Sequence, residues 1–101
     1  MWTLVFFDLP TDTKEARKDY ARFRKYLLKN GFSMMQYSIY MRHHASGENA
    51  VVHGKRIKNA LPLDGEVRIL QITDKQFGKM KIFQGEKSPE PENVPAQLEF
   101  F

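Results

Sequence analysis

The apolar run near the start of the chain, WTLVFFD at positions 2–8, constrains the fold most strongly. It is rich in aromatic and β-branched residues, which favours a β-strand. Successive side chains of a strand point to opposite faces. One face would therefore carry Trp2, Leu4, Phe6 and Asp8, and the other Thr3, Val5 and Phe7. Both faces are largely apolar, which predicts a central strand that is covered on both sides.

An amphipathic helix is predicted over residues 13–30, after Pro10 ends the strand. Asp12 or Thr13 can cap its start, and Asn30-Gly31 supplies its end. The spacing of its apolar residues indicates one buried face, made by Ala16, Tyr20, Phe23 and Leu27.

The middle of the chain predicts a strand region and a second helix. The segment 32–42, FSMMQYSIYMR, is strand-like but long, with a polar break at Gln36. One bulged strand and two short strands in tight succession both fit it. A weaker helix is predicted from a cap at Ser46 to about Leu61.

The last third predicts a strand at 66–73 and a further short strand at 80–84. Residues 86–101 are rich in proline and acids, which predicts an extended tail. We therefore divide the chain into a folded domain at 1–85 and a tail. The tail ends in apolar residues that need a surface to bury against: Leu98, Phe100 and Phe101.

The order of these elements is that of an α+β, ferredoxin-like domain, βαββαβ, with an extra C-terminal strand or tail. Two helices cover only one face of such a sheet. Because the first strand is apolar on both faces, a second copy of the chain is the simplest cover for the other face. We therefore expect a homodimer.

The charge of the chain is unevenly placed. Residues 1–60 hold 11 lysines and arginines against 5 aspartates and glutamates, whereas residues 61–101 hold 5 against 7. The basic part favours an anionic partner, and nucleic acid is the commonest large one. A surface charged for solubility is the alternative interpretation.

Three features predict a soluble, cytoplasmic protein that does not contact a membrane. The chain has no cysteine. Its first residues include Asp8, where a signal peptide would be apolar. No apolar run approaches the length that spans a membrane.

Basic side chains recur along one face of the predicted helix at 13–30. Such a row can follow a phosphate backbone without reading sequence, although a solvated helix face is the alternative. We add Arg42, from the second strand region, to the predicted nucleic-acid-binding residues. The helical residues of this set are Lys14, Arg17, Lys18, Arg22, Lys25 and Lys29.

Asp8 lies where a strand ends in a proline-containing turn, and two interpretations fit it. It can form an Asx-type turn, or it can bind a metal ion. One carboxylate is a poor cage for Mg²⁺, but a two-fold axis would bring two copies of Asp8 together. His43, His44 and His53 lack acidic partners at zinc-protease spacing, and we interpret them as loop and helix-surface residues.

The segments VFFDLP, the basic helix with Arg17, GFSMMQYSIYMR and GEVRILQIT follow one another from Met1 to about Phe83. Together they resemble the CRISPR-associated Cas-two family, most closely its type II versions. The resemblance implies a ferredoxin-like homodimer with the acids of both subunits facing across a cleft. It implies a place in the complex that captures foreign DNA with the Cas-one integrase. Asp8 would be the catalytic acid that binds Mg²⁺, and Arg17 an arginine near the phosphate.

Three functions stay open at this point. The first is a non-catalytic, architectural subunit of spacer acquisition that binds duplex DNA with the Cas-one integrase. The second is a metal-dependent endonuclease, of the endoribonuclease class, that holds Mg²⁺ weakly between subunits at Asp8. The third is a VapD-like toxin ribonuclease of the same fold. In the first, the tail would dock on the integrase or on the partner subunit through Leu98, Phe100 and Phe101.

Overall fold

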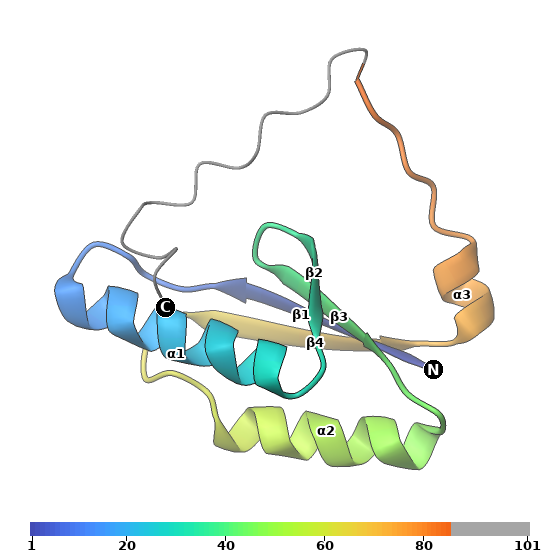
Figure 1. The fold of residues 1–101 in the computed structure, drawn as a ribbon, viewed down its shortest axis with the longest axis horizontal. Coiled ribbons are helices and arrows are strands. Elements are labelled where there is room, and N and C mark those ends of the chain that lie inside the picture. The colour runs from blue at the N-terminus through green and yellow to red at the C-terminus, as the bar shows by residue number, and fades with distance from the viewer. Residues whose placement is uncertain (86–101) are drawn as a thin grey trace.

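The computed structural model describes residues 1–85, so the predicted tail with Leu98, Phe100 and Phe101 lies outside the described residues. The elements follow the predicted ferredoxin-like order, with one short helix added at the end (Figure 1). They are β1 (Trp2–Asp8), α1 (Lys14–Lys29), β2 (Ser33–Gln36), β3 (Ile39–His43), α2 (Gly47–Asn59), β4 (Glu66–Ile72) and α3 (Asp74–Gly78).

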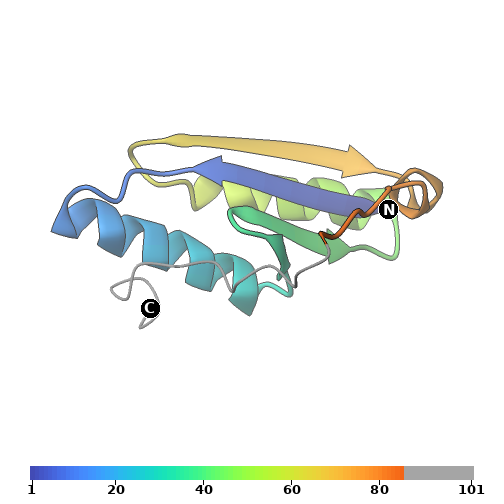
Figure 2. The same ribbon diagram turned by 90° about the horizontal axis from the view of Figure 1, so that it is seen from above.

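The strands form one antiparallel sheet in the order β2-β3-β1-β4, as expected for this fold. Figure 2 shows β1 between β3 and β4, so the prediction of a central first strand is confirmed. Val5 pairs with Tyr40 on one side and Ile69 on the other. At its far end, Asp8 pairs with Glu66.

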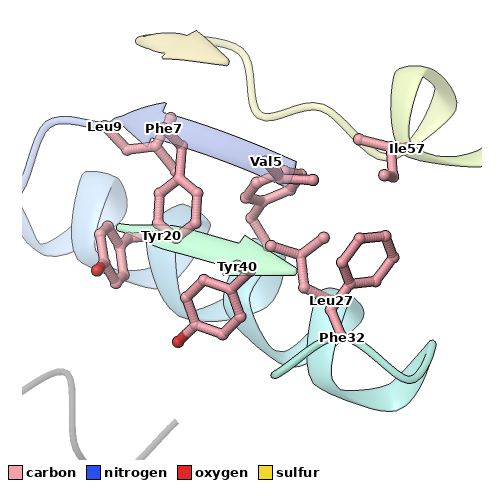
Figure 3. Close-up of a cluster of buried hydrophobic side chains, with 9 residues drawn as sticks. Val5, Phe7, Leu9, Tyr20, Leu27, Phe32, Tyr40 and Ile57 are labelled. Carbon is pink, nitrogen blue, oxygen red and sulfur yellow. The ribbon is translucent and has the colours of Figure 1, made fainter. Parts of the chain in front are cut away.

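Both long helices lie on the same side of the sheet, below it in Figure 1. The core forms between them and the face of β1 that carries Val5 and Phe7 (Figure 3). The ring of Phe7 is at its centre, with centroids 5.7, 5.4 and 5.5 Å from those of Tyr20, Phe23 and Tyr40. Tilted and edge-on ring pairs at this distance add to the free energy gained from burial.

Helix α1 begins and ends where the sequence predicts. Of the two candidate caps, Thr13 serves: its hydroxyl accepts a hydrogen bond from the Ala16 amide at 3.0 Å. Asn30 caps the other end, and Gly31 follows with a φ of 84°, which glycine adopts without strain.

The ambiguous segment 32–42 is a hairpin of two short strands, β2 and β3, that also contains a register shift between Met34 and Gln36. Its turn contacts the end of β1, because the Phe7 amide donates to the Ser38 carbonyl at 3.0 Å. Ser38 has a φ of 61°, an uncommon conformation for a residue other than glycine. The turn is therefore fixed beside Asp8.

The second face of the sheet, which we call the open face, is covered at one end by α3. Phe77 stacks on Trp2 with ring centroids 3.9 Å apart. The expectation that only two helices are available is wrong at this end. Elsewhere the open face keeps accessible apolar area, since Phe6 is half-buried and Leu70 is 49% exposed.

Residues 80–85 contain no strand, so the predicted short strand at 80–84 is wrong. Ile82 and Phe83 are largely exposed and leave the sheet without pairing to it within the described part of the chain. Within residues 1–85, no helix is long and apolar enough to cross a membrane.

Candidate functional site

Asp8 is the last residue of β1, on the open face, and its side chain is exposed. Within residues 1–85 its carboxylate makes no hydrogen bond or ion pair. An Asx-type turn requires the side chain to accept a hydrogen bond from the nearby backbone. That interpretation of Asp8 is therefore wrong, and the carboxylate is available to an external ligand.

A cavity of ≈ 240 Å³ opens beside Asp8. The strand pairing explains its composition: Glu66 lies opposite Asp8, and Arg68 lies opposite Phe6, all on the open face. The Nε of Arg68 donates to the carboxylate of Glu66. The cavity thus combines two carboxylates and one cation with an apolar wall, and its lining residues are Phe6, Phe7, Asp8, Ser38, Ile39, Glu66 and Arg68.

Gly65 fixes the position of the Asp8 backbone. Its φ is +94°, and a Cβ at this position would lie 2.7 Å from the carbonyl oxygen of Asp8 and 2.7 Å from Leu9 Cδ2. Only glycine allows the chain entering β4 to pass this close to the end of β1.

The carboxylates suit a hard divalent cation that keeps most of its water. Within residues 1–85, no group of three or more histidine, aspartate or glutamate side chains is placed to hold a metal. Mg²⁺ does not need one, because it commonly binds through one or two carboxylates, waters and substrate phosphate oxygens. Asp8 fits that requirement, because its carboxylate lines the cavity and has no partner among residues 1–85.

The basic residues of α1 form one exposed row, as the sequence predicts: Lys14, Lys18, Arg22, Lys25 and Lys29. Arg22 also pairs with Asp19 at 3.5 Å. Since α1 lies on the other side of the sheet from the open face, the structure does not bring this row together with Asp8.

Two other predicted arginines are engaged within the fold. Arg17 donates to the Thr11 carbonyl at 3.2 Å and so holds the loop between β1 and α1. Arg42 donates to the carbonyl of Asn30, the residue that caps the end of α1. Its guanidinium also lies 3.4 Å from Nδ1 of His53 on α2. Their roles toward nucleic acid stay predictions.

His44 does not lie at the surface, so the interpretation of all three histidines as surface residues is wrong for this one. It is 3% exposed and its ring lies near those of Phe32 and His53. Burial, with the nearby charges of His53 and Arg42, lowers the pKa of His44 to about 4.

Comparison with known proteins identifies the family. Residues 1–80 match the family model described as CRISPR associated protein Cas2. A protein of Parvibaculum lavamentivorans named CRISPR-associated endoribonuclease Cas2 is 57% identical over the whole of both chains. One of the same name from Flavobacterium psychrophilum is 56% identical over all of this chain and 88% of its own.

The fold comparison agrees. The crystal structure of Streptococcus pyogenes Cas2 superposes with a TM-score of 0.62 at 18% identity, covering 83% of this chain and 100% of that one. The ferredoxin-like assignment is confirmed. By the family match and the identity to its relatives, the chain belongs to the Cas2 family of CRISPR-associated proteins.

Proposed function

We propose that this protein is a Mg²⁺-dependent endonuclease of the endoribonuclease class, with Asp8 as its metal-binding acid. One observation carries the proposal: Asp8 is an exposed carboxylate at the end of a buried central strand, beside a cavity, without a partner among residues 1–85. The relatives named CRISPR-associated endoribonuclease Cas2 support the same activity.

The residues present explain how cleavage would be assisted. Mg²⁺ at Asp8 would neutralise charge on the phosphodiester and favour ionisation of a bound water. Asp8 would hold the ion without giving up a structural hydrogen bond, because its carboxylate has no partner among residues 1–85. Phe6 and Ile39 supply the apolar wall of the cavity beside this carboxylate.

The test is Asp8→Asn, assayed on single-stranded RNA in Mg²⁺. We expect cleavage to fall by about 100-fold or more while the melting temperature stays the same or rises. The control is Asp74→Asn, which alters an aspartate that has partners in the fold and should leave cleavage intact. Undiminished cleavage by a folded Asp8→Asn protein would refute the proposal.

We also propose a homodimer formed through the open face. Exposed apolar area on this face supports it, including the half-exposed Leu70. A two-fold axis near the end of β1 would bring two copies of Asp8 together, and two unscreened carboxylates repel one another. Neutralising Asp8 should therefore preserve the dimer.

Sedimentation tests this assembly. Leu70→Glu should yield a folded monomer, because a charge buried without a partner is costly. Leu63→Glu is the matched control, since Leu63 is 97% exposed in the loop before β4. A wild-type protein that is monomeric at micromolar concentration would contradict the dimer.

The basic row of α1 favours a second function, duplex DNA binding during spacer acquisition with the Cas-one integrase. The row is exposed and can contact phosphates without reading bases. The family match favours such a CRISPR role over the VapD-like toxin alternative.

Charge reversal separates this function from cleavage. Lys18→Glu with Arg22→Glu should weaken duplex DNA binding at least tenfold at low salt and leave RNA cleavage measurable. Lys55→Glu with Lys58→Glu on α2 makes the same charge change away from the row. Equal affinity losses in both variants would show that net charge, and not the α1 row, governs binding.

Docking of the tail on the integrase is a further prediction that a deletion from Lys87 onward tests by pull-down.

A further inference from the structure

The cavity beside Asp8 contains an ion pair that the fold does not need. Glu66 and Arg68 lie two positions apart on β4, an edge strand, with their side chains on the open face. Their side chains are 63% and 77% exposed. An exposed pair of this kind contributes between zero and about 1 kcal/mol to stability. Both side chains can therefore be altered with little effect on the fold.

The geometry of the pair leaves donors free for a ligand. Arg68 uses Nε to bind Glu66. A guanidinium has five N–H donors in a rigid fork, so four remain on its two terminal nitrogens. Within residues 1–85 these terminal nitrogens have no hydrogen-bond partner. Arg68 lines the same cavity as Asp8, so within one copy of the chain these donors are available to a ligand there.

The charges of the cavity favour a cationic side chain beside its carboxylates. Asp8 and Glu66 would together repel a phosphodiester, which carries one negative charge. Pairing with Arg68 offsets the charge of Glu66, and both side chains remain largely exposed. The guanidinium fork matches phosphate oxygens geometrically, which lysine does not.

We propose that Arg68 binds the substrate phosphodiester beside Asp8 and that Glu66 is a positioning residue that orients the Arg68 guanidinium. The proposal rests on the proposed endonuclease function, which it deepens by naming the side chain that holds the phosphate. The ligand class is the phosphodiester backbone of a single nucleic acid strand, contacted without reading the base.

The first experiment measures cleavage of single-stranded RNA in Mg²⁺. Arg68→Ala should lower kcat/KM by about 10- to 100-fold. Arg68→Lys should have a kcat/KM between those of Arg68→Ala and wild type, because lysine keeps the positive charge but lacks the forked guanidinium. Glu66→Gln should give a smaller loss, carried mainly by KM. Melting temperatures of all three should stay close to wild type, which separates this role from a structural one.

The matched control is Arg56→Ala. Arg56 is an exposed arginine of α2, on the other side of the sheet from the cavity, so cleavage should be unchanged. Equal losses in Arg56→Ala and Arg68→Ala would overturn the proposal, since they would reflect net charge alone.

The second experiment removes the dependence on cleavage. In an Asp8→Asn background with EDTA, the affinity for a fluorescein-labelled single-stranded RNA is measured by anisotropy across a salt series. Adding Arg68→Ala should weaken binding about 3- to 10-fold and reduce the salt slope by about 0.7. If wild-type protein does not cleave RNA yet Arg68→Ala has this effect, the endonuclease assignment fails and phosphate binding by Arg68 stands. If cleavage depends on Asp8 but neither readout responds to Arg68→Ala, the assignment of Arg68 is overturned and the endonuclease stands.

Discussion

An aspartate lies on the open face near each end of β1, and the two aspartates differ in their hydrogen-bond partners. At the Trp2 end, Asp74 of α3 lies 2.5 Å from the Met1 amino group and 3.1 Å from Nε2 of His43. The hydrogen bond from the amino group lowers the pKa of Asp74. At the other end, Asp8 has no partner among residues 1–85.

Exposure does not distinguish these two residues, because both are exposed. Partners do. The Trp2 end pairs its aspartate with the Met1 amino group and His43 and is closed by the Phe77–Trp2 stack. At the Asp8 end, a carboxylate and part of a guanidinium beside a cavity have no partner among residues 1–85. An unpartnered charge at a rigid strand end is thus a better sign of a functional group than exposure alone.

The largest expected effect on stability comes from disturbing the Asp8 end with Gly65→Ala. A Cβ there meets the Asp8 carbonyl and demands a positive φ of an ordinary residue. We expect a loss of about 2–4 kcal/mol and a fall in cleavage of roughly tenfold because Asp8 is displaced. Urea unfolding and RNA cleavage measure the two. Gly47→Ala, where a Cβ meets nothing within 4 Å, is the control; similar losses in both variants would contradict this explanation.

The next effect is a dependence of the folding stability on pH, and it comes from the Trp2 end. His44 is buried with its pKa lowered to about 4, whereas the unfolded chain binds that proton near the usual value of 6.5. As pH falls from about 6.5 to 4, the unfolded state gains a proton that the folded state resists, so stability is lost, by up to about 2–3 kcal/mol.

The comparison of pH profiles isolates this residue from the carboxylates that titrate in the same range. His44→Phe should flatten the stability profile between pH 6.5 and 4, since it keeps a ring and removes the titration. Parallel profiles for wild type and His44→Phe would show that His44 does not titrate in this way.

The smallest effect is expected from a substitution that detaches α3 from the Trp2 end and leaves the cavity beside Asp8 unchanged. Phe77→Ala removes a half-buried ring from its stack on Trp2 and should cost about 1–2 kcal/mol. Trp2 is the one tryptophan of the chain, so its fluorescence should shift to longer wavelength as α3 detaches. RNA cleavage should stay at the wild-type rate. A matching loss of cleavage would show that the two ends are coupled and not independent.

Much of the fold was predictable because its signals are local. Strand β1 and helices α1 and α2 follow from side-chain periodicity and from caps at Thr13 and Ser46. Helix α3 was missed because five residues are too few to show a period. Its capping box, in which Thr73 and Gln76 bond reciprocally, was the signal that would have revealed it.

The site was predictable only in part, because its members meet through strand pairing. Asp8 stood out from its position at a strand end. Glu66 and Arg68 share one face of their strand, which the sequence shows, but their place beside Asp8 depends on the register between β1 and β4. The burial of His44 likewise depends on helix α2, whose His53 lies against it. Neither packing has a local sequence signal.

The central position of β1 also has a consequence for synthesis. Its two neighbours, β3 and β4, come later in the chain, and its residue Trp2 cannot pair with Ile72 until β4 has been made. At about 5–20 residues per second, the strand leaves the ribosome several seconds before its sheet can close. During that time a segment with two apolar faces is exposed to solvent, and segments of this kind are prone to aggregate. Chaperone demand and expression yield of this small protein should therefore respond most to substitutions in its first eight residues, even where the finished fold tolerates them.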